Sequence, residues 1–425
     1  MRLLYICLSY LAVPIALWVH LWRGLLDRAH WARLGERLGF GAYASPGGFW
    51  VHAVSVGEVQ AAATLIASLR RRYPSQSLTL STSTVTGRQQ AERLWAGQDV
   101  SIRYLPYDTP RAVRRCLNRV QPRVLVLMET EIWPTLYGEC QRRHIPLLIA
   151  SARLSVRSVR AYGRLGSLVR RALTAVTWVG AQTPADAQRF VEAGADPGCV
   201  DVMGNIKFDV TVPPELGTEA VALRAQWGVD RPVWVAGSTH EGEERAVLEA
   251  HRRVMARCSQ ALLVWAPRHP PRFSQVAALL KQQAVPFVTY SDGGQVPADT
   301  QVVLVDALGV LLRCYAASDL AFVGGSLAAI GGHNVLEPAA LAKPIIVGPS
   351  LHHVVAMTDH LRAALALDVV GDAEELGERL VFLLTHPQEA TQMGARAYDV
   401  LQLNRGALSC LEKALDLVWK KALLH

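Results

Sequence analysis

The sequence predicts an α/β protein with two similar halves, each a parallel sheet covered by helices. Two observations carry this prediction. At 425 residues the chain is longer than one hydrophobic core usually organises. From about residue 48 onward, short β-branched runs alternate with longer helical patterns, which is typical of doubly wound α/β folding. Ligands of such sheets bind beside the carboxyl ends of the strands, so polar residues at those positions are the candidates for function.

The strands of the first half are expected at Trp50–Val54, Leu78–Ser81, Ile102–Leu105, Val124–Met128, Pro146–Ala150, Trp178–Ala181 and Val200–Met203. A polar, proline-containing stretch at Thr211–Thr218 then reads as the link between domains. The strands of the second half are expected at Val233–Ala236, Leu262–Ala266, Phe287–Tyr290, Val302–Val305, Leu320–Val323 and Pro344–Val347. The expected division is therefore a leading segment 1–22 and two domains, 23–210 and 211–425.

A long uncharged segment lies at the start of the sequence. Leu3–Trp22 contains no formally charged side chain, and about 20 apolar residues suffice for a helix to cross the hydrocarbon core of a bilayer. Trp18 and Trp22 suit the membrane interface, and the arginine-rich stretch that follows should stay on the cytoplasmic side. A cleaved signal peptide, a helix lying in the interface and a helix in the protein core are the alternatives. The sequence favours a single-pass membrane anchor over 1–22.

Charge and cysteine content restrict the class of protein. The formal net charge of +8 indicates anionic partners, but no nucleic-acid-binding motif accompanies it, so no nucleic acid is expected as a partner. The seven cysteines are scattered, odd in number and never in CxxC spacing. This pattern favours a reducing compartment and argues against a disulfide framework and a zinc site. The two domains are therefore expected on the cytoplasmic side, without a bound metal.

In the first half, polar residues follow the first two expected strands. The segment VHAVSVGEVQAA places Ser55, Gly57 and Glu58 between a strand and a helix. The dipole of a helix start favours the ionised form of Glu58, whether or not the residue takes part in chemistry. The next strand leads into STSTVTG, whose hydroxyl groups can cap a helix or bind an anion, with capping favoured.

The segment VLVLMETEIWP is more informative. A strongly apolar strand ends there in Glu129 and Glu131, and two carboxylates at the mouth of a buried strand are costly unless they are paired or used. Arg153, in SARLS after the following strand, is a candidate partner for one of them. The segment MGNIKFD ends this half with three polar residues expected to face the ligand cleft: Asn205, Lys207 and Asp209.

In the second half, AGSTHEGEE follows a strand and opens a helix. Ser238 and Glu241 have the spacing of a capping box, which is a structural role. WAPRHPPRF then places Arg268 and His269 just past the next strand. An arginine there suits a phosphate, because its planar fork can donate two hydrogen bonds at once.

The richest segment of the second half is FVGGSLAAIGGHNVLEPAALAKPIIVGP. Its glycines would let backbone N–H groups approach an anion closely, next to a helix start. Glu337, three residues after Asn334, either closes a capping box or binds the two hydroxyls of a ribose. No GxGxxG, P-loop, GxSxG or HExxH motif occurs, which disfavours dehydrogenases, NTPases, serine hydrolases and zinc proteases. A two-domain enzyme that binds a phosphate and a ribose remains.

Together these motifs resemble the Kdo transferases of lipopolysaccharide synthesis, where Kdo is 3-deoxy-D-manno-octulosonic acid. The likeness covers nearly the whole chain, and the segments that carry it are HAVSVGE, METEIWP, ARLS, GNIKFD, AGSTHEGEE, PRHPPRF and GGHNVLEPA. The resemblance implies the GT-B fold, which has two facing Rossmann-like domains. It also implies an inverting transfer of Kdo from CMP-Kdo to a lipid A precursor, lipid IVA, at the cell inner membrane.

The resemblance also implies roles for individual residues. Glu58 matches the family's general base, which deprotonates the acceptor hydroxyl. Glu129 and Lys207 match positions that stabilise the transition state. The domain 23–210 would then bind the acceptor and the domain 211–425 the nucleotide sugar. No cofactor is expected, since the leaving group CMP needs no bound metal to balance a diphosphate.

The family's CMP-binding positions match Pro267, Arg268, Leu308, Gly309, Val310, Asn334, Val335, Leu336 and Glu337. One departure is visible in the segment DALGVL. The family commonly has an acidic residue after the glycine, and this chain has Val310. A contact made through the backbone would survive that change, whereas one made through a side chain would not.

Two other functions compete with this interpretation. A GT-B transferase that uses a different nucleotide sugar would show much the same pattern, because the pattern does not identify cytosine. A catalytically inactive lipid- or nucleotide-binding membrane protein is the second alternative. The presence of both Glu58 and the Glu129/Glu131 pair argues against it.

Overall fold

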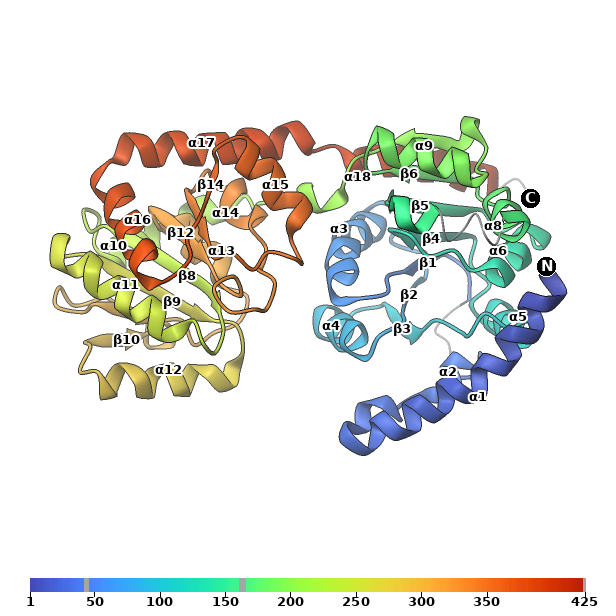
Figure 1. Ribbon diagram of the computed structural model, residues 1–425, viewed down its shortest axis with the longest axis horizontal. Coiled ribbons are helices and arrows are strands. Elements are labelled where there is room, and N and C mark those ends of the chain that lie inside the picture. The colour runs from blue at the N-terminus through green and yellow to red at the C-terminus, as the bar shows by residue number, and fades with distance from the viewer. Residues whose placement is uncertain (42–45, 160–165, 423–425) are drawn as a thin grey trace. The chain divides into compact units, whose positions relative to one another are not determined.

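The chain folds into two compact units in a computed structural model, which describes residues 1–41, 46–159 and 166–422. The first unit contains Met1–Asp209 together with Arg405–His425, and the second unit contains Val210–Asn404 (Figure 1). In the first unit the helices are α1 (Arg2–Leu26), α2 (Leu34–Arg37), α3 (Val56–Arg72), α4 (Val85–Trp95), α5 (Pro110–Val120), α6 (Pro134–Arg142), α8 (Gly166–Leu173), α9 (Pro184–Ala193) and α18 (Ala407–Ala422).

The sheet of the first unit has seven parallel strands in the order β3-β2-β1-β4-β5-β6-β7. They are β1 (Phe49–His52), β2 (Leu78–Thr82), β3 (Ser101–Tyr104), β4 (Val124–Met128), β5 (Leu147–Ala152), β6 (Trp178–Ala181) and β7 (Val200–Val202). Strand β4 has the sequence VLVLM, and all five residues are buried because helices cover both faces of the sheet. The strand order reverses between β1 and β4, which pair directly and form the topological switch point of this unit.

The sheet of the second unit also has seven parallel strands, in the order β10-β11-β9-β8-β12-β13-β14. They are β8 (Val233–Thr239), β9 (Leu262–Pro267), β10 (Phe287–Thr289), β11 (Val302–Leu304), β12 (Leu320–Val323), β13 (Ile345–Val347) and β14 (Leu367–Val369). The helices are α10 (Leu216–Trp227), α11 (Glu244–Arg257), α12 (Pro270–Gln282), α13 (Leu311–Ala317), α14 (Leu336–Ala340), α15 (Val355–Ala363), α16 (Ala373–Thr385) and α17 (Pro387–Asn404). The switch point lies between β8 and β12.

The predicted α/β class and two doubly wound halves are confirmed. Every strand expected from the sequence is present, with ends that shift by a few residues. Strand β14 was not expected. It is a short edge strand with the sequence LDV, in which only Leu367 is buried, so it lacks the run of apolar residues that marks the inner strands.

The last helix departs from the expected division into 23–210 and 211–425. The chain returns at Arg405 to the first unit, where α18 covers one face of the sheet together with α3 and α4. The ring of Trp419 stacks on that of Phe49 with centroids 4.4 Å apart. Leu411 and Leu415, on the same stripe of α18, are buried in this core. Without α18, part of the sheet face that α3, α4 and α18 cover together would expose apolar residues to water. The first unit therefore needs this helix.

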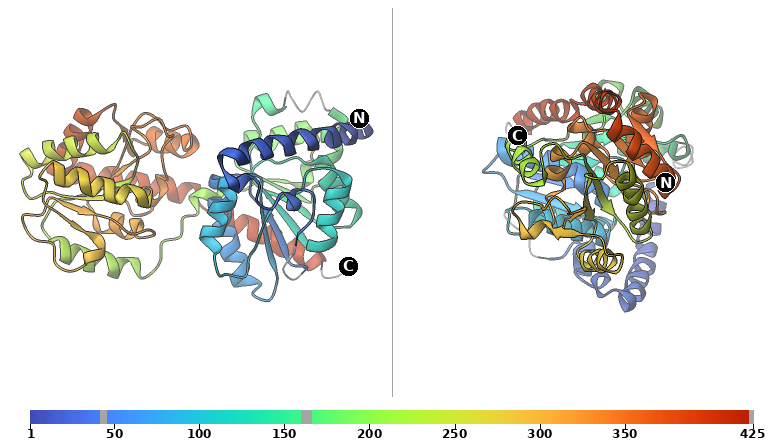
Figure 2. Two further views of the ribbon diagram at one scale, coloured as in Figure 1. Left: turned by 90° about the horizontal axis from the view of Figure 1, so that it is seen from below. Right: turned by 90° about the vertical axis from the view of Figure 1, so that its left-hand side faces the viewer.

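Helix α1 is long and apolar enough to cross a membrane, judged by length and composition. It runs lengthwise along one side of the first unit in both Figure 1 and Figure 2. The Tyr5 hydroxyl donates a hydrogen bond to Asp108 Oδ2 at 2.7 Å, which ties the start of the helix to this unit. Pro14 lies within the helix without ending it.

Candidate functional site

Glu58 lies at the switch point of the first unit. It is in the first turn of α3, directly after the carboxyl end of β1, while Glu129 and Glu131 follow the neighbouring strand β4. The parallel pairing of β1 and β4 explains why acids far apart in the sequence lie together, since parallel strands end at the same edge of a sheet. The structure therefore brings together the three acids that the sequence singled out.

The surroundings of Glu58 suit a general base. Its Oε2 accepts a hydrogen bond from the backbone N–H of Val54 at 2.8 Å, and its Oε1 accepts one from the Ser55 hydroxyl at 3.2 Å. Burial raises the pKa of Glu58 to about 7, and the charges of Glu129 and Glu131 add to the rise, while the two hydrogen bonds oppose it. A carboxylate with a pKa near neutrality is a better proton acceptor than one with an ordinary pKa.

Glu129 forms an ion pair with Lys207. The Lys207 ammonium donates to Glu129 Oε1 at 3.0 Å, and each side chain keeps about a quarter to a third of its surface exposed. Glu129 has a φ of +56°, a left-handed conformation that is uncommon for a residue with a side chain. Strained backbone of this kind is concentrated at functional sites, where it directs a side chain.

Lys207 is positioned by the turn Ile206–Phe208. The Asn205 side chain caps this turn by accepting from the Lys207 N–H at 3.0 Å, and the Ile206 N–H donates to the Ser151 hydroxyl at 3.1 Å. Ser151 lies in β5 and has a φ of +54°, at a register shift between β5 and β6. The ion pair is thus held from two neighbouring strands, β4 and β5.

Glu131 has partners of its own. Its Oε2 accepts a hydrogen bond from Trp133 Nε1 at 2.9 Å and lies 3.9 Å from His52 Nε2. His52 is fully buried, and its Nδ1 lies 2.9 Å from the Ser81 hydroxyl. Its Nε2 has no hydrogen-bond partner within the part of the chain that the structure describes. His52 is a polar residue of this site that sequence reasoning missed, because a histidine inside an apolar strand reads as core.

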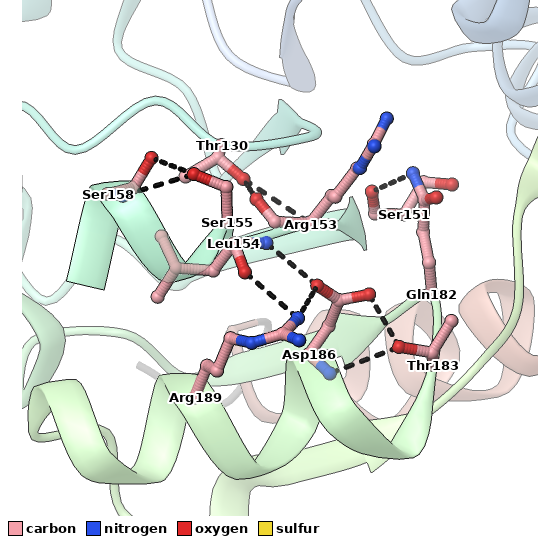
Figure 3. A network of polar contacts seen from close by, with 10 residues as sticks. All are labelled: Thr130, Ser151, Arg153, Leu154, Ser155, Ser158, Gln182, Thr183, Asp186 and Arg189. Atoms are coloured by element: carbon pink, nitrogen blue, oxygen red, sulfur yellow. Dashed lines mark hydrogen bonds and ion pairs between the residues drawn. The ribbon is translucent and has the colours of Figure 1, made fainter. Parts of the chain in front are cut away.

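Arg153, which the sequence suggested as a partner for either Glu129 or Glu131, is not seen paired with either acid among the described residues. Lys207 pairs with Glu129, and Trp133 donates to Glu131. Figure 3 shows that its guanidinium points away from the surrounding polar network. Its backbone N–H donates to the Thr130 hydroxyl at 3.2 Å, and Asp186 accepts from the next N–H, that of Leu154, at 3.0 Å. Asp186 also pairs with Arg189 at 3.1 Å, so the loop after β5 is fixed from α9.

Asp209 does not serve the site as expected. Its two carboxylate oxygens accept hydrogen bonds from the backbone N–H groups of Gly406 at 2.8 Å and Leu408 at 2.6 Å. It therefore caps the start of α18 and joins the point where the chain leaves the first unit to the point where it returns.

The expected capping role in STSTVTG is confirmed, because Thr84 accepts from the Gly87 N–H at 3.0 Å.

In the second unit, the polar segments follow four adjacent strands, β11, β9, β8 and β12. Pro267 ends β9 and Arg268 follows it, with its N–H donating to the Thr239 carbonyl at 3.0 Å. Leu308 and Gly309 are exposed between β11 and α13, and Val310 is the residue before α13. After β12, Asn334 and Val335 precede α14, and Leu336 and Glu337 are its first two residues.

The glycine-rich loop after β12 does not offer an empty anion cradle. Glu243, at the start of α11, is fully buried and fills it. Its carboxylate accepts hydrogen bonds from the backbone N–H groups of Gly325 at 2.7 Å, Ser326 at 2.9 Å and Leu327 at 2.8 Å. Two further N–H groups, of His240 and Ala328, complete the set. The expectation that these N–H groups bind a ligand anion is wrong, because the protein's own carboxylate occupies them.

Glu243 also replaces the capping box expected from Ser238 and Glu241. Ser238 has a φ of +58°, and the Glu241 side chain is 85% exposed and pairs with Arg272 at 3.2 Å. The run EGEE contains three acids before a helix, and only the position of the loop after β12 shows which of them turns inward. Glu243 is thus a second residue that sequence reasoning missed.

Asn334 and Glu337 form a side-chain pair. Asn334 Nδ2 donates to Glu337 Oε1 at 3.1 Å, and Asn334 Oδ1 accepts from the Leu336 N–H at 3.1 Å. Burial raises the pKa of Glu337, while Asn334 and the nearby charge of Arg268 oppose the rise. The structure therefore brings Arg268, Asn334 and Glu337 into one neighbourhood, at the carboxyl ends of β9 and β12.

Three histidines surround Arg268. His240 Nε2 and His333 Nε2 lie 2.7 Å apart with their rings stacked, and the ring of His269 meets that of His240 edge-on at 5.2 Å. Burial lowers the pKa of His333 to about 3, and its cationic and imidazole neighbours add to the effect. The same two causes lower the pKa of His240. The pair is therefore neutral at neutral pH and can donate to or accept from a polar ligand beside the Arg268 charge.

Comparisons with known proteins agree with the motifs. Residues 32–210 match the family profile described as 3-deoxy-D-manno-octulosonic-acid transferase (kdotransferase). The 3-deoxy-D-manno-octulosonic acid transferase of Haemophilus influenzae is 38% identical over 392 residues, which cover 91% of this chain and 90% of that protein. The enzyme of that name from Bordetella pertussis is 36% identical over 423 residues, covering 93% and 95%.

A solved structure extends the likeness to the fold. UDP-GlcNAc 2-epimerase from Neisseria meningitidis, bound to UDP-GlcNAc, superposes with a TM-score of 0.55, and the match covers 87% of this chain and 99% of that one. At 13% identity this shows the shared two-sheet architecture alone. The sequence relatives lead to one conclusion: the chain belongs to the Kdo transferase family, the glycosyltransferases that add Kdo during lipopolysaccharide synthesis.

Proposed function

We propose that this protein transfers Kdo from CMP-Kdo to the lipid A precursor lipid IVA, with inversion at the anomeric carbon and release of CMP. The observation that carries the proposal is the placement of Glu58 at the switch point of the first unit. Its pKa of about 7 and its hydrogen bonds to Val54 and Ser55 give it the properties that a general base needs.

The reaction requires one bond to form and one to break. Glu58 accepts the proton of an acceptor hydroxyl while the hydroxyl oxygen bonds to the anomeric carbon of Kdo. The bond from that carbon to the phosphate oxygen of CMP breaks, and CMP leaves with the electron pair. A displacement of this kind, without a covalent intermediate on the enzyme, inverts the configuration.

Glu129 and Lys207 stabilise the transition state in this proposal. Positive charge develops on the donor sugar as CMP leaves, and the Glu129 carboxylate offsets it. Lys207, 3.0 Å from Glu129, holds that carboxylate in place, and its remaining N–H groups can bind the carboxylate of Kdo. The left-handed backbone at Glu129 supports this role, since such conformations are concentrated at functional sites.

The second unit binds CMP in this proposal. Arg268 binds the phosphate through its guanidinium, with the imidazoles of His240 and His333 beside it. The Asn334–Glu337 pair lies at the carboxyl end of β12 and is placed to bind the ribose hydroxyls. Leu308–Val310 contribute through backbone groups, because their side chains carry no polar atom.

The membrane location is part of the same proposal. The acceptor is a lipid, and α1 is apolar along its length, so we place the enzyme on the inner membrane with both units in the cytoplasm. None of the seven cysteines, all of which lie in the described part of the chain, forms a disulfide bond, which fits a reducing compartment.

The test is a transfer assay with purified protein, CMP-Kdo and a tetraacylated lipid A precursor, followed by mass spectrometry of the lipid. A mass gain of one or more Kdo units would support donor and acceptor together. NMR of the product then gives the anomeric configuration, and retention would overturn the inverting mechanism. Intact CMP-Kdo with a folded protein would favour a different nucleotide sugar.

A further inference from the structure

Helix α1 has two apolar faces, and only one of them contacts the protein. The side toward the first unit consists of partly buried residues at helical spacing: Tyr5, Ser9, Val13, Leu17 and His20. The opposite side carries large apolar residues that are each more than half exposed: Leu4, Leu8, Leu11, Ile15, Trp18, Trp22 and Leu25. We call this second set the outer face of α1. Its spacing of three and four residues places all of it on one stripe.

Both ends of α1 are tied to the first unit. At the start, Tyr5 donates to Asp108, a buried carboxylate that also accepts from the backbone N–H groups of Thr135 and Leu136 at 2.8 Å. At the end, Trp31 Nε1 donates to the Leu21 carbonyl at 2.8 Å, and its ring packs directly on Gly24.

The segment after Trp31 is itself anchored to the sheet. Glu36 in α2 pairs with Arg88 at 2.6 Å and accepts from the Tyr104 N–H in β3 at 3.0 Å. Arg37 donates to the Ser83 carbonyl at 2.8 Å. Helix α1 therefore lies flat on the unit, held at points separated by most of its length. A helix that crossed a bilayer would lose the contact of Tyr5 with Asp108.

Positive charge lies beside the start of α1, on the side of the helix that carries Tyr5, where Arg142 also pairs with Glu139. Arg2, Arg142 and Arg171 line a pocket of about 280 Å³ between the start of α1, α6 and α8. A further arginine near α1 is Arg111, at the start of α5. Its backbone N–H donates to the Tyr10 hydroxyl at 3.4 Å. Trp18 and Trp22 stack with centroids 6.1 Å apart on the outer face, and tryptophan is enriched where lipid meets water. An apolar stripe with cationic neighbours complements an anionic bilayer.

We infer that α1 is an in-plane anchor. It lies parallel to the membrane with its outer face among the acyl chains of anionic phospholipids and its inner face on the first unit. Arg2 and Arg171, beside its start, bind lipid phosphates. This inference rests on the membrane location in the proposed function and is independent of donor and acceptor. It replaces the single-pass anchor that the sequence favoured.

The experiment is site-directed spin labelling of the full chain on vesicles of phosphatidylethanolamine and phosphatidylglycerol. The background replaces by Ser the four cysteines that are not buried, Cys7, Cys199, Cys258 and Cys410. Labels are placed on the outer face at Leu4, Leu11, Trp18 and Leu25, and collision rates with oxygen and with a water-soluble nickel complex report depth. An in-plane helix puts all four labels at one depth. A crossing helix spreads Leu4 and Leu25 by about 32 Å, at about 1.5 Å per residue, and leaves the central labels deepest. That depth profile would overturn the inference.

A variant with a less apolar outer face tests whether this face binds the bilayer. Replacing Leu11, Ile15 and Trp18 by Gln is expected to weaken vesicle binding at least tenfold, with the thermal transitions unchanged. The matched control replaces three exposed apolar residues elsewhere, Val221, Leu403 and Leu417, by Gln and should bind as the parent does. Phosphatidylcholine vesicles should bind either protein less, because they lack net charge.

Two results would contradict the inference. One is vesicle binding that is insensitive to the three outer-face substitutions. The other is self-association of the parent chain in solution, lost in the outer-face variant, without binding to vesicles, since a second copy would then cover the stripe. Neither readout involves CMP-Kdo or lipid IVA, so a failure here is distinct from a failure of the proposed reaction.

Discussion

At the residue scale, the acids at the ends of β1 and β4 are the centre of the proposed chemistry. Burial and the nearby carboxylates raise the pKa of Glu58, and the two hydrogen bonds that it accepts lower it. The balance of these effects sets its affinity for a proton. The neighbouring Glu129 has a cation 3.0 Å away. The two acids therefore differ in environment, as the two different roles proposed for them require.

The first prediction concerns the pH dependence of transfer. Because the base must be ionised and its pKa is about 7, kcat/KM should rise as pH increases through about 7 and level off above it. Glu58→Gln should lower kcat about 10²–10⁴-fold and abolish this limb, while CMP binding persists. The measurement is a pH–rate profile of parent and variant, with CMP affinity by calorimetry. Unimpaired transfer by Glu58→Gln would remove Glu58 from the role of base.

The second prediction concerns the Glu129–Lys207 pair. Glu129→Gln and Lys207→Met should each lower kcat about 100-fold, on the order of the loss of one charged transition-state contact. The double variant should be little worse than either single one, because the two side chains act as a unit.

A double-mutant cycle on kcat measures this coupling. The control cycle uses Arg253 and Glu249, an ion pair on the surface of α11 at 3.3 Å, which should leave kcat unchanged. Strictly additive losses at Glu129 and Lys207 would mean that they act independently.

At the element scale, the glycine-rich loop after β12 depends on α11. Five backbone N–H groups converge on Glu243, and a charged acceptor strengthens each hydrogen bond. The loop carries His333 and leads to Asn334 and Glu337, so its shape determines where the proposed nucleotide contacts lie.

Ser238 and Ser151 show a further parallel between the units, since both have a left-handed backbone at a register shift of their sheets.

The third prediction tests this support. Glu243→Gln replaces one acceptor oxygen by an NH₂ group that faces N–H donors, so several buried N–H groups lose their partner. We expect a loss of about 2–5 kcal/mol in the unfolding free energy and at least tenfold weaker CMP binding. The matched control is Glu241→Gln, two residues away and exposed, which should change neither. Thermal unfolding and calorimetry are the measurements, and equal behaviour of the two variants would contradict the role of Glu243.

At the scale of the whole molecule, the last helix belongs to the unit that the chain left at Asp209. Asp209 joins the two crossing points by capping α18, and Trp419 completes the core above Phe49. The second unit is therefore a continuous insertion, Val210–Asn404, in a first unit made of two separate segments.

The fourth prediction follows from this division. Leu415→Ala, at a residue 1% exposed, should destabilise the first unit by about 2–5 kcal/mol. Leu417→Ala, on the same helix but 64% exposed, should change stability by less than about 0.5 kcal/mol. Calorimetry with and without CMP identifies the transitions, since the ligand should raise that of the unit that binds it. If Leu415→Ala lowered the CMP-sensitive transition instead, α18 would belong to the second unit.

The sequence by itself determined the α/β class, the inner strands and the acids at their ends, because these depend on local periodicity and on residue type. Buried parallel strands such as VLVLM are continuous apolar runs, and a charge at their end stands out. Strand β14 was not predicted, because an edge strand of three residues has no such run. Glu58, Glu129 and Lys207 were singled out by their places after strands, their roles came from the resemblance, and the structure places Glu129 beside Lys207.

Only the tertiary structure decided which groups meet. Lys207 reaches Glu129 across 78 residues of chain, Glu243 fills a loop that follows a different strand, and α18 returns to the first core. It also showed that α1 lies along the first unit and that Asp209 caps a helix instead of facing a ligand. Each of these contacts joins segments that are remote in sequence. Their partners are chosen by the packing of sheets and helices, which no local pattern of residues records.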